Sequence, residues 1–334
     1  MLAMTTAQQR SWEQDGYIVM RAFFTAPELQ RLLRAVDAVG HAVRAAASSS
    51  DELQRQPEQE GSPSPGSFSV RNLVGHSEAF LELVDHPRML PLVVDAMGPN
   101  IQLRTSHLDF RPPYTSAVQQ QLQQRLHRDP SANAVNGANN VGWHPDLKGL
   151  FMQTEPGDGV LPFMEVKAFY TLSDMSTANC GNLWLAAGSH RRPVAELQAW
   201  KQSGLDGGLP TEPPPGAVEL RLPAGAAVLW RTACWHCVGP QLGSTTRKII
   251  HIGYNHRWLR PTDYMEQEPS LLARCSPIRQ QLLGGVPSGA VMGGDAVFEP
   301  TSAYYRQHEA DVPLVAWAAA QQRQRQRHNS DAKL

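Results

Sequence analysis

The tripeptide His-x-Asp occurs three times in the sequence, at residues 107–109, 127–129 and 144–146. In a β-strand the side chains of residues i and i+2 point to the same face, so each tripeptide can direct an imidazole and a carboxylate at one point. The chain contains 12 His, however, and one or two such tripeptides are expected by chance. Taken alone, each is most simply a solvated pair of side chains in a loop.

The tripeptide at 144–146 differs from the other two in what surrounds it. The residues that follow it in order are the segment 180–191, His236 and Arg247. This ordered set is far more specific than any of its parts. The tripeptide at 127–129 adjoins a glutamine-rich stretch and is expected to be exposed, whereas that at 107–109 lies in an expected strand but lacks these downstream partners.

Short apolar or alternating runs with turn residues between them follow residue 100. They lie at 101–104, 163–170, 183–185, 217–220, 227–230 and 249–252. Several short strands separated by Gly/Pro loops are typical of an antiparallel barrel or a double-sheet jelly roll. The sequence therefore predicts a mainly β fold with flanking helices, in which the strands carry the candidate residues.

Helices are expected outside these strands, at about 25–43, 78–97 and 312–322. Thr25 and Glu28 form the capping-box pattern of a helix start, and apolar residues follow at helical spacing. Residues 46–67, an Ala/Ser run followed by Gly and Pro, predict a surface loop.

We expect a single domain over 1–334. Its parts are a helical N-terminal flank at 1–100, a jelly-roll core at 101–260 with an inserted loop at about 115–140, and a C-terminal extension with a polar tail at 261–334.

The composition excludes several classes of function. The 334 residues carry 30 Lys+Arg against 31 Asp+Glu, and a net charge of -1 provides no field for gathering nucleic acid or an anionic membrane. Four Cys are too few for a secreted disulfide framework, and no apolar run reaches the length of a membrane span. We expect a cytoplasmic protein acting on a small-molecule substrate, with the peroxisome as the alternative because Ala332-Lys333-Leu334 is a variant of a peroxisomal signal. The sequence gives no indication of the oligomeric state.

In its motifs the chain resembles the phytanoyl-CoA dioxygenase (PhyH-like) superfamily of Fe(II)- and 2-oxoglutarate-dependent oxygenases, over roughly residues 11–260. The stretches that carry the resemblance are an opening strand at 12–20, Trp143-His144-Pro145-Asp146, a Gly-Ser-His segment at 181–190, and the strand at 228–236. The resemblance implies a double-stranded β-helix, which is a cupin-like jelly roll.

The resemblance also implies roles for four residues. His144, Asp146 and His236 would bind Fe(II), and two imidazoles with one carboxylate leave positions open for 2-oxoglutarate and O2. Arg247 would hold the distal carboxylate of 2-oxoglutarate with its two-pronged guanidinium. Relatives that halogenate carry Ala or Gly in place of the aspartate, so Asp146 predicts oxygen insertion.

The implied reaction is the hydroxylation of a small organic molecule with release of succinate and CO2, with ascorbate as an accessory reductant. Two alternatives stay open. One is a catalytically silent family member that binds a ligand in the same pocket. The other is a metal cupin-type isomerase or hydrolase that uses the three metal ligands without 2-oxoglutarate.

Several residues depart from the family pattern or have open roles. Relatives often have a small hydroxyl residue at position 238, where this chain has Val238, and Cys180 and Ala187 replace an Asn and a Pro of the Gly-Ser-His segment. Cys234 and Cys237 form a C-x-x-C that favours buried thiols over a zinc or redox role. His251 or His256 could be the second histidine ligand instead of His236, but the spacing to Arg247 favours His236, and both are expected to be structural. Four aromatic residues could equally line a substrate pocket or pack in the core, and these are Trp143, Phe169, Tyr170 and Trp184.

Overall fold

The computed structural model describes residues 3–47, 64, 66–128, 142–146, 159–203, 212–285 and 312–331. Its α-helices are α1 (Thr6–Gln14), α2 (Ala26–Ala47), α3 (Glu78–Leu81), α4 (Leu90–Met97), α5 (Ser116–Arg128), α8 (Val194–Lys201), α9 (Pro269–Ala273), α10 (Pro277–Leu282) and α12 (Pro313–Asp331). Two 3-10 turns are η1 (Leu73–Gly75) and η2 (Ser189–Arg191).

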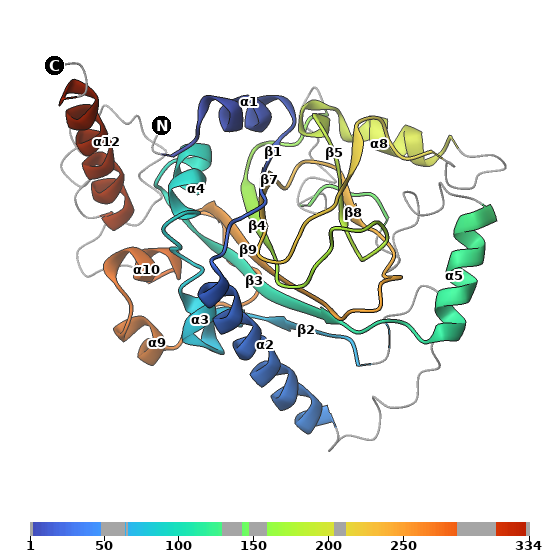
Figure 1. The fold of residues 1–334 in the computed structure, drawn as a ribbon. Coiled ribbons are helices and arrows are strands. Elements are labelled where there is room, and N and C mark those ends of the chain that lie inside the picture. The colour runs from blue at the N-terminus through green and yellow to red at the C-terminus, as the bar shows by residue number, and fades with distance from the viewer. Residues whose placement is uncertain are drawn as a thin grey trace.

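Antiparallel strands form two sheets. The larger has six strands in the order β1 (Tyr17–Met20), β7 (Ala227–Arg231), β4 (Glu165–Thr171), β9 (Arg247–His256), β3 (Ile101–Arg111) and β2 (Phe68–Arg71). The smaller has three strands in the order β6 (Ala217–Leu220), β5 (Leu183–Ala186) and β8 (His236–Val238). Helices α2, α3 and α4 lie along one side of the large sheet, and the small sheet and α8 lie on the other side (Figure 1). The predicted mainly β jelly-roll fold with flanking helices is confirmed.

Alternate residues of the large sheet face different surroundings, as the two-residue period of a strand requires. The outward residues, such as Leu108 and Ile250, join the main apolar core with residues of the helices, Phe80 of α3 among them. The inward residues, such as Phe169 and Trp230, pack with side chains of the small sheet in a second cluster. The space between the two sheets therefore receives every second side chain of the large sheet, and Arg247 at the start of β9 is among them.

The first predicted helix begins as expected. Thr25 N–H donates to Glu28 Oε2 at 2.7 Å, and Glu28 N–H donates to Thr25 Oγ1 at 3.5 Å, which is the reciprocal capping box of α2. Leu32 and Val36 of this helix are buried in the main core.

The N-terminal flank expected to be helical over 1–100 contributes two strands to the large sheet as well as helices. Strand β1 pairs with β7 at one edge of the large sheet, and β2 pairs with β3 at the other edge. Of the stretch at 12–20 expected as a strand, the first part belongs to α1 and only Tyr17–Met20 is a strand. Phe68–Arg71 was not predicted as a strand, because a run of four residues is too short to give a clear pattern.

Two other helix boundaries also differ from the prediction. The single helix expected over 78–97 is divided into α3 and α4, because Pro87 in between cannot continue a helix, whereas Pro91 fits the first turn of α4. Gly98 ends α4 with φ 79°, as its position predicted. The polar tail expected from residue 323 is largely helical, since α12 runs to Asp331.

The inserted loop expected at about 115–140 is in part a helix. Helix α5 covers Ser116–Arg128. Its many Gln, Leu and Arg residues are good helix formers, but the glutamine-rich composition was interpreted as that of a loop. Val118 of this helix packs on Tyr114. The rest of that loop, most of the surface loop expected at 46–67, and Ala332-Lys333-Leu334 lie outside the described residues.

Helices long and apolar enough to cross a membrane do not occur in the described part of the chain.

Phe80 tests the contribution of the helix layer to stability. Its side chain is fully buried between the helices and the large sheet, and Phe→Ala changes at such sites cost about 3–5 kcal/mol. We expect Phe80→Ala to lower the free energy of unfolding in urea by that amount. Val218→Ala is the control, since Val218 is 42% exposed and should change the stability by at most about 0.5 kcal/mol. Equal effects of the two changes would contradict this description of the core.

Candidate metal centre

The backbone brings His144 and Asp146 against β8. His144 and His236 exchange both of their backbone hydrogen bonds, at 3.0 and 2.9 Å, and Asp146 N–H donates to Thr232 O at 2.9 Å. These bonds form a short antiparallel ladder, in which directly opposed side chains lie close together. Residues separated by about ninety positions in the sequence thus become neighbours.

Both imidazoles are fixed in the orientation that a metal ligand needs. Nδ1 of His144 lies 2.7 Å from Gly142 O, and Nδ1 of His236 lies 2.9 Å from Cys234 O. Because a carbonyl oxygen only accepts hydrogen bonds, each Nδ1 carries the proton, and each Nε2 keeps its lone pair. Burial lowers the pKa of His236 to about 4, so this ring is neutral at neutral pH.

Asp146 completes the group. Its carboxylate oxygens lie 4.0 Å from Nε2 of His144 and 3.7 Å from Nε2 of His236. Burial alone would raise the pKa of Asp146, but the ammonium of Lys167, whose Nζ donates to Oδ2 at 2.7 Å, and His236 hold that pKa well below its usual range. The group therefore offers Nε2 of two imidazoles, of which that of His236 is neutral, and an ionised carboxylate, with one ligand atom of each within 4.8 Å of the others.

This donor set matches the two-histidine, one-carboxylate arrangement that binds iron(II) in non-haem oxygenases. The three residues are those singled out in the sequence, and the structure brings them together as a group that could hold a metal ion. Lys167 was missed because a lysine in an apolar strand carries no signal of its own. Only the tertiary fold shows that it faces a carboxylate.

Arg247 lies in the interior at the start of β9 and is only 1% exposed. Nε donates to Gly181 O at 2.8 Å, whereas both terminal nitrogens are buried without a partner among the described residues. Gly181 has φ 71°, and a Cβ there would lie 2.5 Å from Cδ of Arg247, so the close approach requires glycine. The two free prongs of the guanidinium match the two oxygens of a carboxylate.

A second arginine faces the same small cavity. Arg111 on β3 is the register partner of Arg247, and burial together with Arg111 lowers the pKa of Arg247 to about 9. The cavity is lined by Arg111, Tyr114, Gly181, Val238, Gln241 and Arg247. Asp109 offsets part of the repulsion between these two cations, and the two terminal nitrogens of Arg247, which are unpaired within the described residues, suit the cavity to a further carboxylate group. Arg111 was also missed, although its position in the strand next to β9 follows from the topology.

The structure also shows the surroundings of the cysteines and of the four aromatic residues whose roles the sequence left undecided. All four cysteines are free and buried, and burial raises the pKa of Cys234 to about 12, so neither a disulfide nor a reactive thiolate is indicated at the C-x-x-C. Trp143 packs beside Trp235 in a buried cluster to which Trp184 also belongs, and Tyr170 packs in the main core. Phe169 contacts an inward polar side chain, His251.

The sequence profile of the phytanoyl-CoA dioxygenase family matches residues 12–249, a range that includes both candidate histidines, Asp146 and Arg247. The chain belongs to the phytanoyl-CoA dioxygenase family. A relative from Stutzerimonas stutzeri, described as a probable alpha-ketoglutarate-dependent hypophosphite dioxygenase, is 24% identical over 322 residues, covering 90% of this chain and all of the relative.

Solved structures share the fold of this family member. The structure of HygX from Streptomyces hygroscopicus, with nickel and 2-oxoglutarate bound, has a TM-score of 0.50 at 18% identity and covers 82% of this chain and 95% of its own. The carbocyclase SnoK from nogalamycin biosynthesis has a TM-score of 0.52 at 16% identity and covers 79% of this chain and 94% of its own. Membership of the family makes this protein a non-haem iron, 2-oxoglutarate-dependent oxygenase by class.

Proposed function

We propose that the protein is an Fe(II)- and 2-oxoglutarate-dependent dioxygenase that hydroxylates a small molecule and releases succinate and CO2. Two observations carry the proposal together: three ligand atoms converge, and both terminal nitrogens of Arg247 are buried without a partner among the described residues. The first feature fits a metal ion and the second fits the carboxylate of a cosubstrate.

In this proposal His144, Asp146 and His236 hold the iron. With 2-oxoglutarate bound, the metal supplies the oxidising power of the reaction, and three protein ligands leave room for both cosubstrates. Lys167 keeps Asp146 ionised and fixes one of its oxygens through the 2.7 Å hydrogen bond. The carbonyls of Gly142 and Cys234 keep both rings turned with Nε2 towards the metal position.

Arg247 and Arg111 would bind the distal carboxylate of 2-oxoglutarate. Val238 lines this cavity, so the hydroxyl that relatives often place there is not available, and the two arginines provide the recognition instead. Phe169 and Trp230 lie edge to face at 6.3 Å on the inner face of the large sheet. Their rings would shield the reacting groups from water, which strengthens the electrostatic interactions there.

The first test is a binding measurement that needs no substrate. Anaerobic addition of Fe(II) and then 2-oxoglutarate should produce the visible charge-transfer band of a chelated 2-oxo acid. The cupin-type isomerase or hydrolase of the alternative should give no such band. A chain that binds neither iron nor 2-oxoglutarate would contradict the proposal outright.

Turnover is tested with hypophosphite first, because the full-length relative is named for that substrate. One oxygen atom of O2 would enter a P–H bond to give phosphite, and the other would enter succinate, so the two products should form in equal amounts. Small carboxylic acids and amino-acid derivatives complete the panel. The charge-transfer band without succinate formation on any of these substrates would favour the silent ligand-binding alternative.

A further inference from the structure

A second polar cluster lies on the inner face of the large sheet. His107 and Asp109 follow the two-residue period of β3, and His251 of β9 is the register partner of His107. One potential ligand atom of each lies within 4.8 Å of the others. His107 therefore does have a downstream partner, and His251, expected to be a plain structural residue, is part of this cluster.

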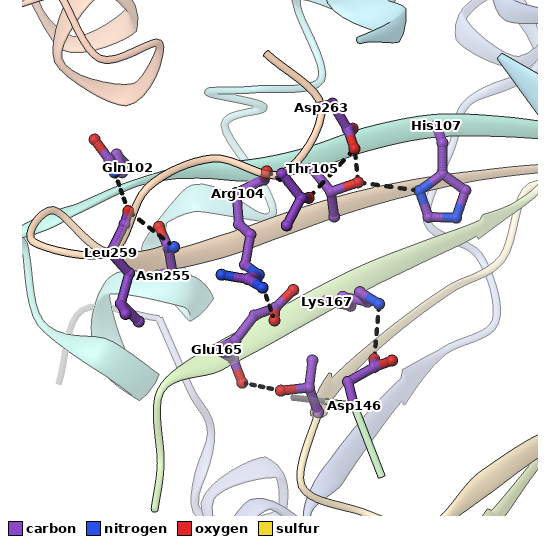
Figure 2. A network of polar contacts seen from close by, with 12 residues as sticks. Gln102, Arg104, Thr105, His107, Asp146, Glu165, Lys167, Asn255, Leu259 and Asp263 are labelled. Atoms are coloured by element: carbon purple, nitrogen blue, oxygen red, sulfur yellow. Dashed lines mark hydrogen bonds and ion pairs between the residues drawn. The ribbon is translucent and has the colours of Figure 1, made fainter. Parts of the chain in front are cut away.

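The cluster adjoins the candidate metal centre. The indole of Trp230 contacts the rings of His236 and His251, with both centroid distances 5.9 Å. Lys167 extends from β4 to Asp146, and His107 on β3 lies on the same side of the sheet (Figure 2). Because the indole of Trp230 contacts both, a ligand that reaches from the second cluster to the candidate metal centre would need to be little longer than one indole ring.

Ring geometry argues against a second metal ion here. The imidazoles of His107 and His251 are stacked, with centroids 4.3 Å apart and planes at 18°. The lone pair of an imidazole nitrogen lies in the ring plane, so two nearly parallel rings cannot both direct a lone pair at one ion between them. The rings of His144 and His236, by contrast, are inclined at 48°.

The charges around the cluster favour an anion. Burial lowers the pKa of His251 well below its usual range, and nearby cations lower it further. The largest of these contributions comes from His107, followed by Lys167, Arg247 and Arg71. The negative charge of Asp109 is balanced by arginines, since burial raises the pKa of Asp109 but His107, Arg247 and Arg111 bring it below the usual value. The cations around the cluster thus face the carboxylates of Asp109 and Asp263, and they are the groups with which an anion would pair.

Polar atoms of the cluster can form further hydrogen bonds. Nδ1 of His251 is buried without a hydrogen bond among the described residues, a state that costs about 1–3 kcal/mol. Nδ1 of His107 is in contact with Thr105 Oγ1 and Arg71, each at 3.3 Å, which leaves Nε2 for a ligand. Lys167 has three N–H groups, and Asp146 is its one hydrogen-bond acceptor within the described ranges.

We infer that Lys167, His107 and His251 bind a compact oxyanion group of the substrate beside the metal centre. The inference rests on the proposed function and names the class of substrate. The ligand carries a negative charge on at least two oxygen atoms, either as an inorganic oxyanion or as the phosphonate end of a small organic molecule. Phe169 contacts both His251 and Trp230 edge to face and so lies next to this position.

Calorimetry on the protein loaded with Ni(II) and 2-oxoglutarate tests the inference without turnover. The probes are hypophosphite, methylphosphonate and, as a neutral compound of similar size, acetone. The decisive variants are His107→Phe and His251→Phe, which keep the ring but remove its nitrogens and do not touch the metal ligands. The matched control is His256→Phe, because His256 stacks on the exposed Trp258 at 6.2 Å.

The wild type should bind one oxyanion per chain and no acetone. Each decisive variant should weaken oxyanion binding about 10-fold, which corresponds to about 1.4 kcal/mol, with metal content and 2-oxoglutarate affinity unchanged. Lys167→Met should weaken it at least as much, whereas Lys248→Met on the same sheet should not. Tighter binding of hypophosphite than of methylphosphonate assigns the inorganic source, and the reverse order assigns the organic one.

Two results would overturn the inference. One is unaltered oxyanion affinity in both histidine variants. The other is a metal content of two ions per chain that falls to one in His251→Phe, which would make the cluster a metal site. Failure of the proposed function would look different, because the wild type would then lack the 2-oxoglutarate complex while oxyanion binding to the metal-free protein could still be measured.

Discussion

Asp146→Ala is expected to reduce succinate formation by more than about 100-fold. Changing a residue that only supports a metal ligand costs up to about 100-fold, and Asp146 is itself a proposed ligand. The change takes away the one anionic ligand of the proposed site and reduces three protein ligands to two. It also leaves the buried ammonium of Lys167 without its 2.7 Å partner, next to the position of a divalent cation. Iron content after dialysis, determined by mass spectrometry, and succinate, determined by chromatography, measure the two effects separately.

A second variant distinguishes the loss of a metal ligand from a failure of the protein to fold. Asp146→Asn keeps the size of the side chain and an acceptor for Lys167 but removes the charge, so it should fold and still bind iron weakly. Asp174→Ala is the matched control, since Asp174 accepts a hydrogen bond only from the neighbouring Ser176 N–H in the described structure. Succinate formation that survives in Asp146→Ala would show that this aspartate is not a ligand.

The fold was predictable where a pattern ran over many residues. The alternation at 217–220 and the capping box at Thr25 were placed correctly because local spacing determines them. The division between α3 and α4 could have been read from Pro87. Strand β3, which runs from Ile101 to Arg111, was predicted as a run at 101–104 and a separate expected strand around 107–109, because polar inward residues interrupt its apolar run.

The candidate site was predictable in its ligands and not in its surroundings. His144, Asp146 and His236 form a motif whose order is visible in the sequence. Lys167 and the pair of His107 and His251 carry no such order, because what joins them is the register of β3, β4 and β9. Polar residues on the inner face of a sheet look like ordinary solvent-facing positions of a strand until the second sheet is known to cover them.

Arg247→Met is expected to weaken the binding of 2-oxoglutarate by about 100-fold or more, because it removes two hydrogen bonds to a charged group, each worth about 1.5–3 kcal/mol. Arg247→Lys should lie between this variant and the wild type, since an ammonium keeps the charge but cannot match both carboxylate oxygens. The charge-transfer band under anaerobic titration gives the affinities directly. Arg260→Lys, at an exposed position beyond β9, should leave them unchanged.

The stability of the variant distinguishes a binding role from a structural one. Both terminal nitrogens of Arg247 are buried without a partner among the described residues, and Arg111 lies opposite. This guanidinium therefore lowers the free energy of unfolding of the protein without 2-oxoglutarate. Its replacement by an apolar side chain of similar length should therefore leave the melting temperature of the protein without 2-oxoglutarate unchanged or raise it, and should remove the increase that 2-oxoglutarate causes in the wild type. A variant that melts earlier and still binds 2-oxoglutarate would assign Arg247 to the fold and leave the distal carboxylate to another cation, of which Arg111 is the nearest in register.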